Sequence, residues 1–264
     1  MKNFITIIAL ILLPYLMSEN AGAQDDFKMK RFISGDTPPQ VSLEHFVLDD
    51  VDVKGELEGS YKKNRYLTTN DIVYLKLKNP AVSVGDRFSI FTTGKKLGKT
   101  AQSIRLKGFV TVTKVLPTSV VGKIDDAKVD IHLGDKVGPE LSPNVSISPQ
   151  EPTANVRGKI LGSTESLAMI GAYHFVYIDK GANDGIRLND SLDVIRTADG
   201  SSKVTPGLPE VTIAKLAVVQ LASHTAIAYA IAAADAFEQG ATFKSNVSEV
   251  KYLSDQLQKS AQPQ

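Results

Sequence analysis

The sequence predicts an all-β protein made of two tandem copies of one small barrel or sandwich. Three observations predict this fold class: an internal repeat, apolar side chains that alternate along short runs, and turn residues between the runs. Residues 53–60, VKGELEGS, return at 156–163 as VRGKILGS, an offset of 103. Further along, Gly134 aligns with Gly240 at an offset of 106. Such self-similarity at a nearly fixed spacing indicates a duplicated structural unit.

The apolar runs have the period of strands. Val73, Leu75 and Leu77 alternate with tyrosine and lysine, and Val110 and Val112 alternate with threonine. A period of two in runs rich in valine, isoleucine and threonine predicts strands that bury one face.

Residues 214–237 are rich in alanine and have the composition of a helix. Ile227, Tyr229 and Ile231 nevertheless alternate with alanine at a period of two. The matching part of the first copy contains Pro117, and proline is not tolerated in a helix interior. Because duplicated copies share a fold, we predict strands here as well.

Pairs of glycine or asparagine followed by aspartate stand just before apolar strands. Glycine or asparagine can take the positive φ of a tight turn, and the aspartate can accept hydrogen bonds from neighbouring amides. We therefore expect a structural role for these pairs. They are Gly85-Asp86, Gly134-Asp135 and Asn189-Asp190.

Composition and repeat boundaries divide the chain into six segments. The spacer between the copies holds four prolines, which favours an extended linker. The segments are a signal peptide at 1–23, an acidic leader at 24–52 with a strand expected over 41–48, the first copy at 53–137, a Pro-rich linker at 138–155, the second copy at 156–243 and a polar tail at 244–264.

The first segment predicts export to the periplasm. An apolar run at 4–17 follows a positive start, and Ala21 and Ala23 give the small-x-small pattern of a signal peptidase site before Gln24. No later apolar stretch reaches the about 20 residues that a membrane-spanning helix needs. The chain has no cysteine, so each copy is expected to be held together by its apolar core.

The near-neutral net charge of +1 hides an unequal distribution. Residues 53–137 hold 16 Lys and Arg against 8 Asp and Glu, whereas 156–243 hold 7 against 9. Two interpretations stay open: a surface for an anionic partner such as cell-wall polymer, lipid head groups or an acidic protein, and ordinary charged loops that serve solubility. The export signal and the lack of aromatic residues in the loop at 94–107 disfavour nucleic acid. The basic residues of this candidate surface are Lys62, Lys63, Arg65, Lys95, Lys96, Lys99, Arg105 and Lys107.

The residue patterns do not predict a catalytic set. Residues 94–100, GKKLGKT, have three residues between the glycines, where a phosphate-binding loop needs four. His45, His132, His174 and His224 lack the spacing of metal ligands. We expect no metal, no cofactor and no enzymatic activity. An enzyme would need a pocket between the copies in which side chains with shifted pKa values converge.

Strand and turn signatures follow one another in order over about residues 50–243. They are DIVY at 71–74, VGDRF at 84–88, GFV at 108–110, LGDKVGP at 133–139, VRGKI at 156–160, VYIDKGANDG at 176–185 and DSLDV at 190–194. This series resembles the β-rich region downstream of the LysM module in exported, peptidoglycan-binding LysM proteins of Gram-negative bacteria. The LysM repeat itself is absent, so no glycan-binding residue is carried over. The second copy is also similar to the C-terminal domain of the flagellar assembly protein T.

These observations together predict an exported, non-enzymatic protein of a Gram-negative envelope. We expect a structural or adaptor role near the peptidoglycan, with cell-wall polymer or an envelope protein as partner. The alternative is a component of an envelope machine, such as a flagellar basal-body ring, that binds protein partners. The sequence does not predict the oligomeric state.

Overall fold

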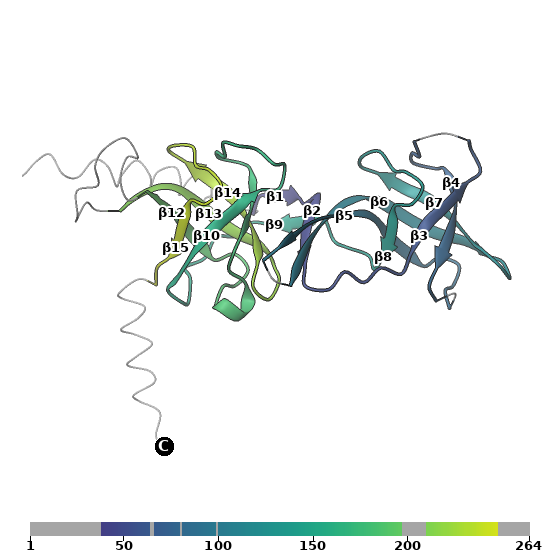
Figure 1. Cartoon of the computed structure of the whole chain (residues 1–264), viewed down its shortest axis with the longest axis horizontal. Helices are drawn as coiled ribbons and strands as arrows, with labels where there is room; N and C mark the ends of the chain where they lie inside the picture. The colour runs from purple at the N-terminus through teal and green to yellow at the C-terminus, as the bar shows by residue number, and fades with distance from the viewer. Residues whose placement is uncertain (1–37, 64–65, 80, 99, 197–209, 248–264) are drawn as a thin grey trace, which may run out of the picture. The chain divides into compact units, whose positions relative to one another are not determined.

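The computed structural model describes residues 38–63, 66–79, 81–98, 100–196 and 210–247. Strands dominate these residues, and the only helix among them is the short 3-10 turn η1 (Ala182–Asp184). Most of the strands belong to two groups of six (Figure 1). The all-β prediction is confirmed.

The first group of strands closes on itself. Neighbours pair in the order β3-β4-β7-β6-β5-β8, and β8 pairs back with β3, always antiparallel. We call this group the first barrel. Its strands are β3 (Gly55–Ser60), β4 (Ile72–Leu77), β5 (Arg87–Leu97), β6 (Ala101–Val115), β7 (Val120–Ala127) and β8 (Lys136–Gly138).

The second group is a closed barrel with the order β10-β11-β14-β13-β12-β15. The alanine-rich stretch forms two of its strands, as the period of two predicted, and not a helix. The strands of this second barrel are β10 (Val156–Ser163), β11 (Phe175–Ile178), β12 (Ser191–Arg196), β13 (Val211–Leu221), β14 (Ala226–Ala233) and β15 (Thr242–Ser245).

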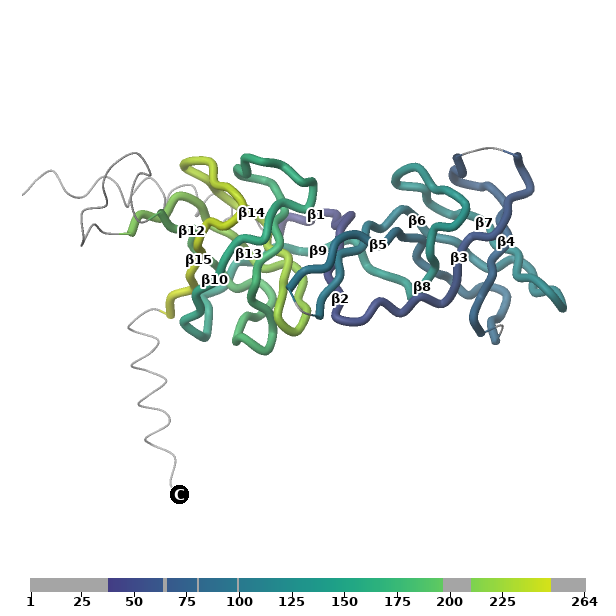
Figure 2. The backbone as a smooth tube through the Cα atoms, in the orientation of Figure 1, coloured from purple at the N-terminus to yellow at the C-terminus, as the bar shows by residue number. Residues whose placement is uncertain are grey.

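The two barrels have the same pairing order. If β3 to β8 are matched with β10 to β15 in sequence order, each of the six pairings in the first barrel recurs in the second. An isolated bridge also recurs: Leu67 pairs with Ile131, and Ile170 pairs with Phe237, at offsets of 103 and 106. The smooth backbone trace in Figure 2 follows the strands of each barrel.

Each barrel interior is filled by apolar side chains. The first contains a buried cluster that includes Leu57, Ile90 and Val110, and the second a cluster that includes Val176 and Phe243. Side chains alternate between the two faces of a strand, so these inward positions match the period of two in the sequence. Small barrels are stabilised in this way, because side chains fill the interior.

Three short strands lie in the predicted leader and linker. The strand expected over 41–48 forms as two strands, β1 (Gln40–Ser42) and β2 (His45–Leu48). In the linker, β9 (Asn144–Ser146) pairs with β1, and Gln150 forms a parallel bridge with Asp190. The Pro-rich segment is therefore hydrogen-bonded to other parts of the chain.

Strand β2 joins the first barrel to the second. It extends the first barrel by pairing with β6, and the described residues from 39 onward belong to one compact unit. On its other side, the N–H of Val47 donates to Gln220 Oε1 at 2.9 Å, and Gln220 Nε2 donates to the carbonyl of Val47 at 2.7 Å. The N–H of Ser223 donates to Asp49 Oδ2 at 2.7 Å.

Tyr177 of β11 lies at the same junction. Its neighbours Val176 and Ile178 belong to the interior cluster, so Tyr177 points outward from the second barrel, yet it is only 2% exposed. Lys95 of β5 lies over its ring at 5.6 Å. Burial raises the pKa of Tyr177 to about 12, although a hydrogen bond with Ser103 acts in the opposite direction.

Candidate functional site

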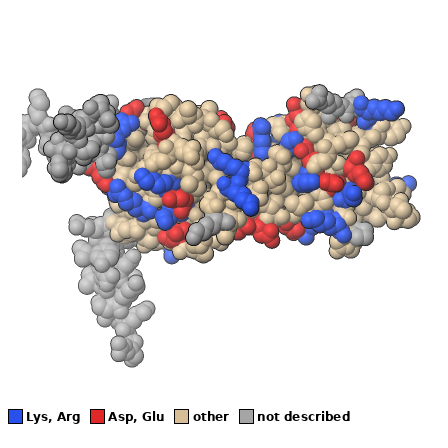
Figure 3. All heavy atoms as spheres, viewed as in Figure 1, with Lys and Arg blue, Asp and Glu red and all other residues tan. Residues whose placement is uncertain are grey.

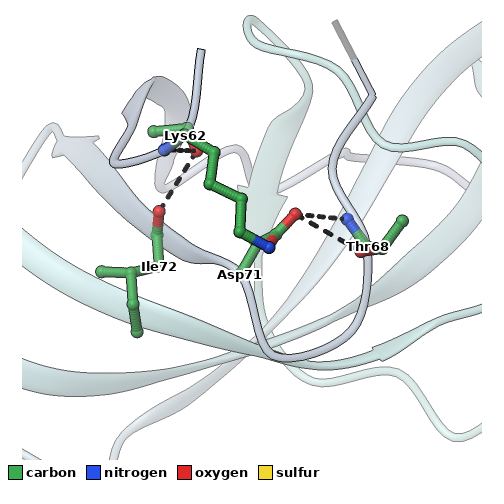
Figure 4. Close-up of polar contacts among 5 residues, drawn as sticks. Lys62, Thr68, Asp71 and Ile72 are labelled. Atoms are coloured by element: carbon green, nitrogen blue, oxygen red, sulfur yellow. Dashed lines mark hydrogen bonds and ion pairs between the residues drawn. The ribbon is translucent and has the colours of Figure 1, made fainter. Parts of the chain in front are cut away.

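The structure divides the predicted basic surface into separate places. Lys62 lies between β3 and β4, and its Nζ donates to Asp71 Oδ1 at 2.6 Å (Figure 4). Asp71 is 2% exposed and also accepts from the N–H of Thr68 at 2.9 Å. The hydrogen bond from Lys62, followed by that from Thr68, lowers the pKa of Asp71. The adjacent Lys63 is exposed.

Among the described residues, the β5–β6 hairpin carries Lys95, Lys96, Arg105 and Lys107, and several of these have acidic or aromatic neighbours. Arg105 contacts Glu44 at 3.3 Å, and Lys95 contacts the ring of Tyr177. Lys96 is exposed. Figure 3 shows Lys and Arg interspersed with Asp and Glu on the face that it draws.

Lys107 is part of a largely buried ion pair. Its Nζ donates to both carboxylate oxygens of Asp135, at 3.0 and 2.7 Å, and the two side chains are only 12% and 10% exposed. Lys107 is therefore a structural residue of the first barrel. The predicted residues Arg65, Lys99, Ala21, Ala23 and Gln24 lie outside the described residues.

The turn role of the Gly-Asp pairs is confirmed. Gly85, Gly134 and Asn189 have φ angles of 98°, 88° and 67°. In each case the following aspartate accepts a hydrogen bond from the amide three residues before it. These bonds are Ser83 to Asp86 at 2.9 Å, His132 to Asp135 at 2.7 Å and Arg187 to Asp190 at 2.8 Å.

A cavity of about 490 Å³ lies where the two barrels meet. It is lined by residues 42–45 before and within β2, by Arg105 of β6, by residues 164–166 after β10 and by Phe175 of β11. We call it the junction cavity. Its volume falls within the range of about 300–1,000 Å³ that is typical of small-ligand sites.

The junction cavity contains charges of both signs. Burial lowers the pKa of His45, and the neighbouring Arg105 lowers it further, whereas Glu44 and Glu165 act in the opposite direction. The imidazole is therefore neutral at neutral pH and can both donate and accept hydrogen bonds. Carboxylates, a guanidinium, hydroxyls and an imidazole thus line one cavity.

The loop after β10 holds a strained residue at the cavity. Ser166 has a φ of 60°, in the left-handed region that is uncommon for residues other than glycine. The buried hydroxyl of Ser163 supports the loop by accepting from the N–H groups of Glu165 at 3.0 Å and Leu167 at 3.4 Å. Backbone strain of this kind clusters at binding sites.

An aromatic group adjoins the junction cavity, and it consists of Tyr173, Phe175 and Tyr229. The ring centroids of Phe175 and Tyr229 are 4.9 Å apart, and those of Tyr173 and Tyr229 are 6.4 Å apart. Tyr173 is 68% exposed. Burial, together with the nearby Tyr173, raises the pKa of Tyr229. Phe175 belongs to both the aromatic group and the cavity lining.

Sequence reasoning named Arg105 as a basic surface residue but placed no other lining residue at a site. It gave a pocket between the copies only as what an enzyme would need. The sequence predicted only that His45 is not a metal ligand, it gave Tyr229 as one of the alternating residues of a strand, and it did not single out Phe175. The cavity brings together segments near residues 43, 105, 165 and 175, so no local spacing reveals it. A comparison of the two copies could have indicated part of the site, because Tyr173, Phe175 and Tyr229 have no aromatic counterparts in the first copy.

Comparisons with known proteins add no family. The chain matches no protein-family model, and a search of curated proteins also finds no match. Within the described part of the chain, no helix has the length and apolar character to span a membrane. The described residues also contain no group of three His, Asp or Glu side chains suited to a metal ion.

His45 should make the stability of the protein depend on pH. The folded state resists protonation of this buried imidazole, so the unfolded state binds more protons below the ordinary histidine pKa of about 6.5. Stability should therefore decrease as pH falls through and below this value. We expect His45→Gln to remove that part of the decrease, as measured by urea unfolding between about pH 7.5 and 5. Equal pH slopes for the two proteins would contradict the effect.

Proposed function

We propose that this chain is an exported, non-catalytic protein of the cell envelope with a structural or adaptor role near the peptidoglycan. The observation that carries the proposal is the pair of six-stranded barrels with one pairing order and apolar interiors. A barrel with a packed interior presents its outer surface and its loops to a partner. Two such barrels in one chain offer two outer surfaces for partners.

The shared pairing order supports a tandem duplication. Both barrels have a bulge in their first strand, between Leu57 and Gly59 and between Ile160 and Gly162, at an offset of 103. The same offset appears in the sequence repeat, so pattern and topology agree. We propose that the two barrels descend from one ancestral module.

The use of carboxylates supports a structural role. In both barrels, aspartates accept hydrogen bonds from the backbone amide three residues before them and so stabilise turns. These side chains are engaged in the fold, whereas general acid–base catalysis needs a carboxylate that can reach a substrate. The aspartates are Asp71, Asp86, Asp135, Asp184 and Asp190. The junction cavity, which Glu44 and Glu165 line, is the pocket between the copies that an enzyme would need, so catalysis there is the alternative to this proposal.

The proposed location rests on the sequence. The signal peptide pattern at 1–23 supports the periplasm, and the resemblance to LysM proteins supports proximity to the wall. For contact with an anionic wall polymer, we propose Lys63 and Lys96, which are exposed and come from the more basic copy.

Purified sacculi test the proposal. The exported form of the protein, isolated from cells, is incubated with sacculi at low and moderate salt. We expect retention that decreases as salt rises, because exposed charges are screened beyond a Debye length of about 10 Å at 0.1 M. The double variant Lys63→Glu/Lys96→Glu should be retained several-fold less.

A matched control separates a specific surface from net charge. Lys78→Glu/Lys114→Glu makes the same charge change at exposed positions elsewhere in the first barrel. Equal losses in both double variants would contradict the proposed surface, and wild-type protein that is not retained at low salt would contradict wall contact. If the partner is instead a basal-body protein, cross-linking in cells should return basal-body subunits.

A further inference from the structure

The two barrels differ sharply at one set of equivalent positions. Ile72 pairs with Lys123 between β4 and β7, and the equivalent pair between β11 and β14 is Phe175 with Tyr229. Asn70 of the first copy has a φ of 72°, and its counterpart Tyr173 has a φ of 71°. Asparagine, isoleucine and lysine in the first barrel are thus replaced by three aromatic residues in the second.

Tyr173 occupies a backbone conformation that does not favour it. Asparagine is several-fold enriched in the left-handed region, whereas a bulky residue there is an outlier that marks strain. The conformation is fixed by the hydrogen bond from the N–H of Tyr173 to the carbonyl of Ala230 at 2.6 Å. His174 supports the turn by accepting from the N–H of Gly171 at 3.2 Å, as Asp71 accepts from Thr68 in the first barrel (Figure 4).

The strained turn holds the Tyr173 ring in solvent next to Tyr229. Exposed apolar side chains of the same loop, Leu167 and Met169, are 37% and 54% exposed. A large apolar surface that remains in water costs free energy, so several exposed apolar side chains in one loop favour an interaction site. The aromatic group leads through Phe175 into the polar junction cavity.

We propose that the aromatic group and the junction cavity together bind a saccharide chain, an inference that rests on the proposed envelope function. A sugar ring has an apolar face of C–H groups and a rim of hydroxyls that both donate and accept. Tyr173, Phe175 and Tyr229 provide flat apolar surfaces for such faces. The cavity supplies acceptors from Glu44 and Glu165, and donors from Arg105.

The mixed polarity of the cavity favours a saccharide over other ligands. Both charge signs occur together, since Arg105 contacts Glu44, so the cavity does not select a simple anion or cation. Ser42, Thr164 and Ser166 also line the cavity, and their hydroxyls can both donate hydrogen bonds to sugar hydroxyls and accept hydrogen bonds from them.

Calorimetric titration of the exported form tests the inference with two soluble probes. These are a hexamer of β-1,4-linked N-acetylglucosamine, which represents wall glycan, and the corresponding glucose hexamer, which represents an unsubstituted glucan. We expect saturable binding of at least one of them, and the better probe identifies the source of the ligand. Saturable binding of neither would overturn the proposal.

Two variants place residues of the first barrel at the equivalent positions of the second barrel. Tyr173→Asn and Tyr229→Lys should each weaken binding by about tenfold or more, because each removes one aromatic surface. Tyr173→Asn should not lower the melting temperature, since asparagine suits the left-handed turn. Tyr61→Ala, which removes an 80% exposed tyrosine elsewhere, is the control and should bind like the wild type. Unchanged affinity in both aromatic variants would overturn the site.

Failure of the saccharide site can be distinguished from failure of the proposed wall contact. Salt-sensitive retention on sacculi without hexamer binding would remove the saccharide site and leave the envelope role standing. Hexamer binding without retention would support the site and contradict the proposed contact with the wall.

Discussion

Replacing Asp135 with alanine is expected to lower the free energy of unfolding of the first barrel by about 3 to 5 kcal/mol. The substitution leaves the Lys107 ammonium, which is only 12% exposed, without its carboxylate partner. Loss of one member of a buried ion pair is costly because the remaining charge is neither solvated nor paired. It also removes the acceptor for the N–H of His132. Urea unfolding followed by circular dichroism measures the change.

Two comparisons separate the buried charge from a generic substitution. The double variant Lys107→Met/Asp135→Asn removes both charges and should recover much of the loss, because an apolar group replaces the stranded ammonium. Asp52→Ala breaks a pair whose side chains are 49% and 53% exposed and should cost far less. A loss for Asp135→Ala no larger than that of Asp52→Ala would show that the burial has no energetic consequence.

Phe243→Ala is expected to destabilise the second barrel by about 3 to 5 kcal/mol. Phe243 is 0% exposed and lies in β15, between Gly158 of β10 and Val194 of β12. Its ring fills the space that glycine leaves, since a Cβ at position 158 would lie 2.6 Å from the ring. Alanine would leave a cavity in the core, and the loss grows with the volume of that cavity.

Substitutions of different size at position 243 test whether the loss of stability comes from the cavity. Phe243→Leu should cost less than Phe243→Ala, because it retains most of the apolar contacts. Val211→Ala, at a 58% exposed position of β13, should change stability only slightly. If Phe243→Ala cost less than about 1 kcal/mol in guanidinium unfolding, the ring would not be a core residue.

The sequence predicted the strands and their turns because both are local features. The alternation of Ile227, Tyr229 and Ile231 with alanine, together with Pro117 in the matching part of the first copy, predicted the strand β14 despite its helical composition. Likewise, Gly134 and Asp135 form the expected turn, since φ and the capping bond depend on neighbours within three residues. The period of the apolar residues and the residues of a turn can both be recognised within short stretches of sequence.

Contacts between residues far apart in the chain could not be predicted from the sequence. Lys107 was grouped with other basic residues, yet its partner Asp135 lies 28 positions away and is reached only when the barrel forms. The same holds for Arg105 and Glu44, which are 61 positions apart. A cluster of positive charge in sequence thus became several neutralised pairs. The junction cavity was unpredictable for the same reason, since its lining depends on how β2 docks.

The side-chain amide of Gln220 has a consequence for association. Strand β2 has one side bonded to β6, and on the other side the peptide groups of Val47 bond to Gln220 instead of to another strand. An open strand margin is a template for the backbone of a neighbouring molecule. Here the side-chain amide of Gln220 takes the hydrogen bonds that a neighbouring strand would make at the free edge of β2. This edge is therefore protected against pairing with a strand of another molecule.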